Sequence, residues 1–227
     1  MQDKRVKKAR NLLASSILLA LASWVIPILA LAALPIQYLY THLHEISHAL
    51  VAVATGGTGV TIRVFADGSG VTTSFGGWQL LVSPAGYVGG TIFGAAILFW
   101  SRSAEGARKA LSSIAVVLGI GLLLWIRGDL FGLISAVLGI AGLALAAKYL
   151  KGDALAFCGQ FIGAYLSLAS LQAVFSIFGF GSMAMQVNDA VILEQATGIP
   201  AALSALLWAG VSVTVVVAML IRAWKDV

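Results

Sequence analysis

The chain has 227 residues, of which 60% are hydrophobic and only 10% are charged, with a formal net charge of +5. A soluble domain carries about 25% charged residues, so this composition excludes an ordinary soluble protein. Four apolar runs are each long enough to cross a bilayer: Leu12–Ala33, Leu80–Trp100, Ala154–Phe178 and Ala201–Ile221. We therefore expect an all-α polytopic membrane protein that forms a single domain over residues 1–227.

Basic residues cluster ahead of the first apolar run. Such clusters usually face the cytoplasm, which predicts a basic cytoplasmic N-terminus over residues 1–11. Because the cluster abuts a hydrophobic span, we expect no nucleic-acid partner. Leu12–Ala33 is longer than the core of a signal peptide and lacks a small-residue cleavage site, so it is read as an anchor. Cys158 is the only cysteine, which excludes an intrachain disulfide and a multi-cysteine metal site.

The next apolar segment is Pro35–Ala54, in which Pro35 is expected to mark a turn or the start of a helix, and it carries His44-Glu45-Ile46-Ser47-His48. Residues four apart share a helix face, so both imidazoles can bind one zinc ion, with Glu45 beside them as the base for a zinc-bound water. An ionised carboxylate near the bilayer centre costs about 2.5–3.5 kcal/mol, which disfavours the alternative of a polar helix that merely lines a pocket. His42 lies about 200° around the helix from His44, so we expect it at a pocket or an interface.

A short region after this helix has the pattern of paired strands. Val60–Thr73 is rich in β-branched residues and is interrupted by the turn sequence Ala66–Gly70. This pattern predicts a short β-hairpin within residues 56–77. Because unpaired backbone groups cannot face lipid, the hairpin must lie at the membrane interface or pack against protein.

Further apolar segments follow at 78–100, 112–126, 130–150, 154–181 and 201–221, with a charged loop at 101–109. The chain should therefore contain six or seven helical segments. Seven full crossings from a cytoplasmic N-terminus would place most later basic residues outside, against the usual charge bias. The conflict disappears if residues 34–101 make one net crossing, with one helix re-entrant.

A catalytic zinc usually has three protein ligands, so a further carboxylate is needed. The less apolar region 182–200, predicted to be a loop or helix, contains Asp189 as the best candidate and Glu194 as the next. Asn188 is a candidate hydrogen-bonding group around the metal. The alternative role for Asp189 is to cap the N-terminus of a helix, to which aspartate is well suited.

His44–Leu50 resembles the active-site helix of site-2-protease-like membrane zinc metallopeptidases, and most closely the compact bacterial and plant branch without extra soluble domains. The glycine-rich turn at 55–57, the Asp67–Gly70 turn and the Gly/Pro-rich Ser83–Gly90 resemble elements that follow it in that branch. Asn188-Asp189-Ala190, with Thr197–Pro200 downstream, resembles the late aspartate element that completes the zinc site. The chain departs from the many family members with a G-P-x-x-N-like element, because Ser83–Gly90 has no asparagine, and no glycine follows Asp189.

The resemblance implies a zinc-dependent, membrane-embedded endopeptidase, with His44, His48 and Asp189 binding Zn²⁺ and Glu45 as the general base. Its substrates would be membrane proteins or peptides in the lipid bilayer, and its location a bacterial cell membrane or a plastid membrane. The Val60–Thr73 hairpin would either bind an unwound substrate as an added strand or plug the cavity mouth, and Asn188 is a second candidate for substrate contact. The alternative is a non-enzymatic polytopic membrane protein, either a small transporter or an assembly or pseudoprotease factor.

Overall fold

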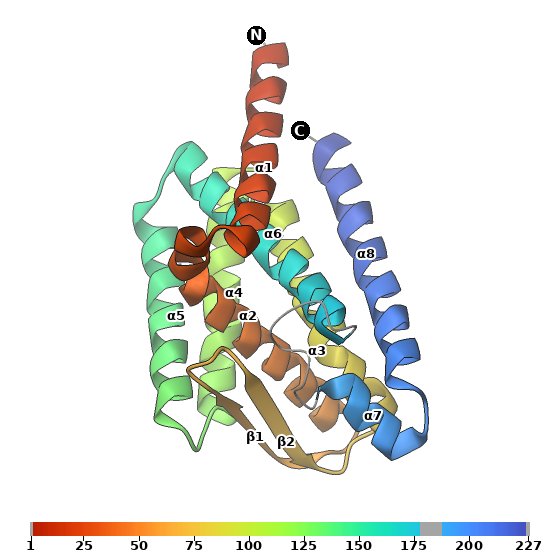
Figure 1. The fold of residues 1–227 in the computed structure, drawn as a ribbon. Helices are drawn as coiled ribbons and strands as arrows, with labels where there is room; N and C mark the ends of the chain where they lie inside the picture. Colours follow the sequence, from red (N-terminus) through yellow and green to blue (C-terminus); the bar gives the residue numbers. More distant parts are fainter. Residues whose placement is uncertain (1, 178–187, 226–227) are drawn as a thin grey trace.

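The computed structural model describes residues 2–177 and 188–225. These residues form eight helices and one antiparallel β-hairpin (Figure 1), which confirms the predicted fold class. Seven long helices correspond to the seven predicted segments, and the eighth lies within the predicted 182–200 region. Two parts of these predictions lie outside the described residues, namely 182–187 of that region and 178–181 of the predicted span at 154–181. In chain order the elements are α1 Gln2–Val25, α2 Pro27–Ala54, β1 Thr58–Val64, β2 Gly70–Phe75, α3 Gln79–Trp100, α4 Ala104–Leu124, α5 Leu130–Tyr149, α6 Gly152–Ile177, α7 Asp189–Thr197 and α8 Ala201–Lys225.

Two predicted helix boundaries are wrong. The break between the first two helices lies at Ile26, where α1 and α2 meet at 107°, and not at Pro35. Ile26 is extended because it precedes proline, whereas Pro27 fits the first turn of α2, where its missing N–H is not needed. Pro35 is accommodated inside α2, as prolines often are within packed membrane helices. The predicted loop at 101–109 is shorter than expected, because the Ser103 hydroxyl caps α4 by accepting from the backbone N–H of Gly106 at 3.1 Å.

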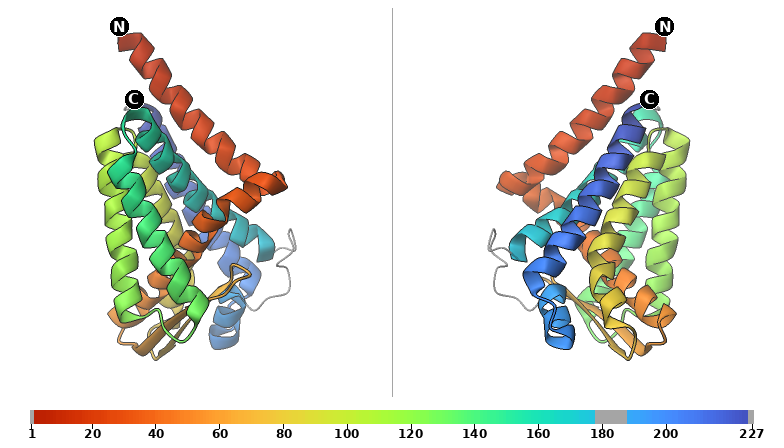
Figure 2. Two further views of the ribbon diagram at one scale, coloured as in Figure 1. Left: turned by 90° about the vertical axis from the view of Figure 1, so that its left-hand side faces the viewer. Right: turned by 90° about the vertical axis from the view of Figure 1, so that its right-hand side faces the viewer.

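The helices run between two ends of one bundle (Figures 1 and 2). Five described helices are long and apolar enough to cross a membrane, and the bent pair α1–α2 provides a sixth crossing when it is counted as one span. Both described termini and the α3–α4 and α5–α6 connections lie at one end, with the hairpin and α7 at the other (Figure 1). If α1 and α2 count together as one span, the charge conflict does not arise, whereas the expected route placed the single net crossing within residues 34–101.

The hairpin is held by the α4–α5 connection. Ile62 pairs with Thr72 across the hairpin. The Ile62 N–H donates to the carbonyl of Trp125 at 2.8 Å, and the Arg127 N–H donates to the carbonyl of Ile62 at 3.1 Å. The outer edge of β1 is thus occupied, whereas among the described residues β2 pairs with β1 alone.

Two aspartates fix the geometry around this hairpin. Asp67 Oδ1 accepts from both the hydroxyl and the backbone N–H of Ser69, at 2.6 and 2.9 Å, and these hydrogen bonds hold the pKa of Asp67 below its ordinary value. Asp129 caps α5 at the N–H of Gly132 and accepts from the N–H of Val64 in β1 at 3.3 Å. The hairpin turn and the start of α5 are therefore locked by side-chain oxygens.

Glycines let α3 approach its neighbours closely. A Cβ on Gly94 would lie 2.5 Å from the backbone nitrogen of Ser167 in α6, and one on Gly163 would lie 2.5 Å from that of Leu98 in α3. Helices in membranes commonly associate through such small residues. This contact packs α3 against α6, and α3 also packs against α2 and α8.

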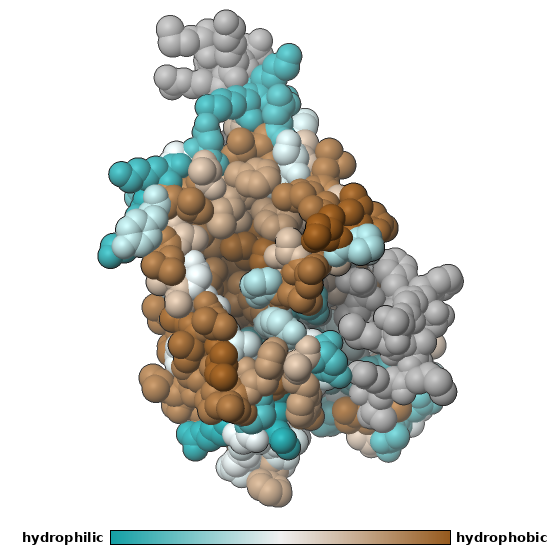
Figure 3. All heavy atoms as spheres, turned by 60° about the vertical axis from the view of Figure 1, so that its left-hand side comes forward, coloured by the Kyte–Doolittle hydropathy of each residue, from teal (hydrophilic) through white to brown (hydrophobic). Residues whose placement is uncertain are grey.

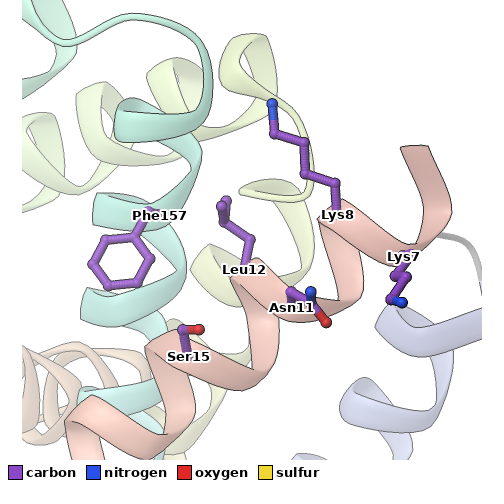
Figure 4. Close-up of a pocket in the computed structure, with 6 residues that line it drawn as sticks. All are labelled: Lys7, Lys8, Asn11, Leu12, Ser15 and Phe157. Atoms are coloured by element: carbon purple, nitrogen blue, oxygen red, sulfur yellow. The ribbon is translucent and has the colours of Figure 1, made fainter. Parts of the chain in front are cut away.

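The surface shows a broad apolar band between polar ends (Figure 3). A cavity of about 500 Å³ lies beside α1 and α6 at the end that carries the termini (Figure 4). The residues that line it are Lys7, Lys8, Asn11, Leu12, Ser15 and Phe157. This cavity is separate from the H-E-x-x-H motif, which lies in the half of α2 nearer the hairpin (Figure 1).

Candidate metal centre

The three predicted metal ligands come together in space. His44 and His48 lie one turn apart on α2, and their Nε2 atoms are 3.1 Å apart. Asp189, at the first position of α7, places Oδ2 at 3.2 Å from His44 Nε2 and 3.3 Å from His48 Nε2. The fold therefore brings a carboxylate to the two imidazoles from a point 145 residues beyond His44.

The three donor atoms form a triangle whose dimensions suit a tetrahedral zinc ion. Zinc bound at about 2.0–2.1 Å separates neighbouring ligand atoms by about 3.3 Å. Gly86 of α3 leaves space beside them, because a Cβ there would lie 2.3 Å from His44 Nε2 and 2.4 Å from His48 Nε2. Two imidazoles and one carboxylate are also an established ligand set for catalytic zinc, so the residues present fit the metal.

Hydrogen-bonding partners orient both rings. His48 Nδ1 donates to the carbonyl of Val82 in α3 at 2.7 Å, which leaves the Nε2 lone pair for a metal. His44 Nδ1 lies 3.4 Å from the hydroxyl of Tyr40, one turn earlier on α2. These contacts set the direction of each ring before any ligand binds.

Asn188, and not Asp189, caps α7. The Asn188 side-chain oxygen accepts from the N–H groups of Ala190 and Val191 at 3.1 and 3.2 Å. The Asp189 carboxylate is thereby available to point at the histidines. Glu194, the other candidate ligand, accepts from the N–H of Ala201 at 3.2 Å at the start of α8. A role for Asn188 in substrate binding stays a prediction.

A small apolar cluster, separate from the main core, fixes α7 against the bundle. Ala190 and Leu193 of α7 are buried together with Tyr87 of α3 and Trp208 of α8. The Tyr87 ring stacks on Trp208 at a centroid distance of 5.4 Å. It also meets the His44 ring edge to face at 4.9 Å. The contact between Tyr87 and His44 therefore links the position of α7 to the metal ligands.

Glu45 is buried and is held by the hairpin. The Thr72 hydroxyl of β2 donates to Glu45 Oε2 at 2.6 Å and lies 3.0 Å from the backbone carbonyl of Glu45. A Cβ on Gly70, at the start of β2, would lie 2.7 Å from Glu45 Oε1. The hairpin thus crosses α2 directly over the predicted base.

His42 takes no part in this cluster. Its Nε2 lies 2.9 Å from the hydroxyl of Ser135 in α5. This contact agrees with its helical angle relative to His44, which predicts an interface position.

The sequence alone did not single out several residues that shape the centre. Gly86 and Tyr87 fall within Ser83–Gly90, which was noted only as a Gly/Pro-rich stretch, and which of its residues faces the histidines depends on the rotation of α3. Thr72 lay within the predicted hairpin without an assigned partner. Trp208 lay in a generic span and carried no local signal.

We predict that Gly86→Ala abolishes metal binding without unfolding the protein, because the added methyl group would occupy the space between the two Nε2 atoms. Zinc content of the purified variant, measured by elemental analysis, tests this. Gly142→Ala in α5 is the matched control, since a Cβ there meets nothing within 4 Å. Wild-type zinc content and affinity in Gly86→Ala would contradict the assigned geometry.

Comparison with known proteins identifies the family to which the chain belongs. The model of the family described as Peptidase M50B-like matches residues 13–219. Searches of curated proteins and of solved structures gave no significant match. The family match agrees with the site-2-protease-like resemblance of the motifs, and the apolar helices agree with an integral, multi-pass membrane protein. Since the match covers most of its length, the chain belongs to the Peptidase M50B-like family.

Proposed function

We propose that this protein is a zinc-dependent endopeptidase that hydrolyses peptide bonds of membrane-protein substrates. The observation that carries the proposal is the triangle of His44 Nε2, His48 Nε2 and Asp189 Oδ2, with sides of 3.1 to 3.3 Å. A proton-conducting transporter would need ionisable groups but no such metal-sized arrangement. The resemblance to a bacterial and plant branch supports location in a bacterial cell membrane or a plastid membrane.

The proposed chemistry divides between the metal and Glu45. When bound, zinc would supply Lewis-acid chemistry that lowers the pKa of a water molecule and polarises a peptide carbonyl. Glu45 is the general base: it accepts the proton of the attacking water and returns it to the leaving amine. Thr72 holds Oε2 of Glu45, and we assign Oε1 to proton transfer. Glu45 is buried, which reduces the screening of its charge by bulk water and strengthens the electrostatics of this exchange.

The register of the hairpin supports the proposal that the substrate backbone binds along the outer edge of β2. Ile62 directs its N–H and carbonyl away from β2, so its partner Thr72 directs its own backbone groups away from β1. By alternation Gly70 and Ser74 do the same. A substrate segment in extended form would pair with these groups, next to the residue that holds Glu45. Pairing would also unwind a helical segment and so expose its peptide bonds.

We predict that Glu45→Gln still folds and binds one zinc ion but loses proteolysis, because glutamine cannot accept the proton. The loss should be about 10²–10⁴-fold, the usual contribution of a general base. Zinc analysis together with cleavage of a fluorogenic unfolded protein and of co-reconstituted membrane proteins measures both properties. Cleavage at the wild-type rate would show that Glu45 is not the base.

The β2 edge is tested with Ser74→Pro, which removes one outward N–H while sparing the bonds between the two strands. We expect a higher KM with little change in zinc content, because one substrate hydrogen bond is lost. Ser74→Ala is the control, since it keeps the N–H and removes only the hydroxyl. If both variants leave KM unchanged, the hairpin covers the site without binding substrate as a strand.

A further inference from the structure

The cavity between α1 and α6 combines polar groups from one helix with an aromatic ring from the other. Its volume of about 500 Å³ lies within the range of small-molecule sites, about 300–1,000 Å³. The Phe157 ring projects from α6, and the polar side chains from α1 are Lys7, Lys8, Asn11 and Ser15 (Figure 4). The cavity therefore offers ammonium, amide and hydroxyl donors beside an aromatic surface.

Most of these polar groups are free to bind a ligand. Among the residues that the structure describes, the side chains of Lys7, Asn11 and Ser15 make no hydrogen bond and no ion pair, and all three are exposed. On the buried face of α1 the situation differs, because the Ser16 hydroxyl donates to the backbone carbonyl of Leu13 at 2.8 Å. The free donors are thus confined to the face of α1 that lines the cavity.

The charge around the cavity is positive. Five of the fourteen Lys and Arg residues of the chain lie within residues 4–10. Lys8 forms an ion pair with Asp153 in the first turn of α6, whereas Lys7 has no acidic partner within the described part of the chain. Lysine binds phosphate groups as a compact positive charge. The cavity therefore favours an anionic group, which Lys7 would contact.

The face of α1 that lines the cavity becomes apolar further along the helix. At about 100° per residue, five side chains fall within an arc of about 80°: Lys7, Asn11, Ser15, Leu18 and Val25. Leu18 is 65% exposed and Val25 is 78% exposed. Val25 lies about 15 Å beyond Ser15 along the helix, which is about half the thickness of a hydrocarbon core. This face thus carries a cationic, hydrogen-bonding part that continues into an apolar part.

From this arrangement we propose that the cavity between α1 and α6 binds one anionic phospholipid. The headgroup phosphate accepts from Lys7 and Asn11, the Ser15 hydroxyl donates to an ester oxygen, and the acyl chains lie along Leu18 and Val25. A soluble phosphate compound would contact only the polar part and leave the apolar part uncovered, so the face fits a lipid better. The inference does not depend on the proposed peptidase activity.

Lipid binding by the purified full chain tests this proposal. The protein in a neutral detergent is titrated with phosphatidylglycerol, and native mass spectrometry counts the lipid molecules that it retains. Phosphatidylcholine with the same acyl chains tests the need for net negative charge, and competition by glycerol 3-phosphate tests the need for acyl chains. We expect one tightly bound phosphatidylglycerol, weaker binding of phosphatidylcholine, and no displacement by an equal concentration of glycerol 3-phosphate.

Variants of α1 locate the lipid. Lys7→Gln should weaken phosphatidylglycerol binding about fivefold, the usual contribution of one lysine next to anionic lipid. Asn11→Leu should also weaken it, because the amide donor is lost while the charge is unchanged. The matched control is Lys148→Gln, which removes the same charge from an exposed lysine in α5, away from the cavity, and should leave binding unchanged.

Three results would overturn the proposal: equal affinity for the two lipids, displacement of phosphatidylglycerol by an equal concentration of glycerol 3-phosphate, or equal losses in Lys7→Gln and Lys148→Gln. The second would identify a free phosphate compound as the ligand, and the third would indicate a general effect of charge. Thermal unfolding in lipid-free detergent checks that each variant is folded. Lys7→Met replaces Lys7→Gln if the latter does not fold.

Discussion

The close approach of α3 to α2 at Gly86 is the contact on which the candidate site depends. Any side chain larger than hydrogen at this position would meet the Nε2 atoms of His44 and His48. The same approach brings the Val82 carbonyl to His48 and the Tyr87 ring to His44. One glycine therefore permits both the space at the ligands and the contacts that orient them.

Ionisable groups within an apolar bundle have to be matched by partners, since an unpaired charge is costly there. Asp189 faces two histidines, and Glu45 accepts from Thr72. Both matches depend on short elements outside the main bundle, namely α7 and the hairpin. The hairpin is tied to the α4–α5 connection, and α7 is fixed between α3 and α8 by its own apolar cluster. The helix α7 and the hairpin thus supply Asp189 and the contact to Glu45, and α2 supplies the two histidines.

The sequence predicted those features that follow from local chemistry. Hydropathy located the long helices, β-branched residues located the hairpin, and the four-residue spacing placed His44 and His48 on one face. The bend at Ile26 was missed because the break was expected at Pro35, whereas Pro27 begins α2 and Pro35 lies inside it. Gly86 was not identified because its role depends on how α3 is rotated against α2. Likewise, the sequence offered Asp189 as a helix cap, whereas the fold gives that role to Asn188.

The central claim is that His44, His48 and Asp189 form one zinc site. Zinc stoichiometry and affinity, measured on purified wild type, Asp189→Ala and Glu194→Ala, test it most directly. The account predicts one tightly bound zinc in the wild type and in Glu194→Ala, whose side chain instead contacts the start of α8, and loss of tight binding in Asp189→Ala. Asp189→Ala that binds zinc as tightly as the wild type would contradict it.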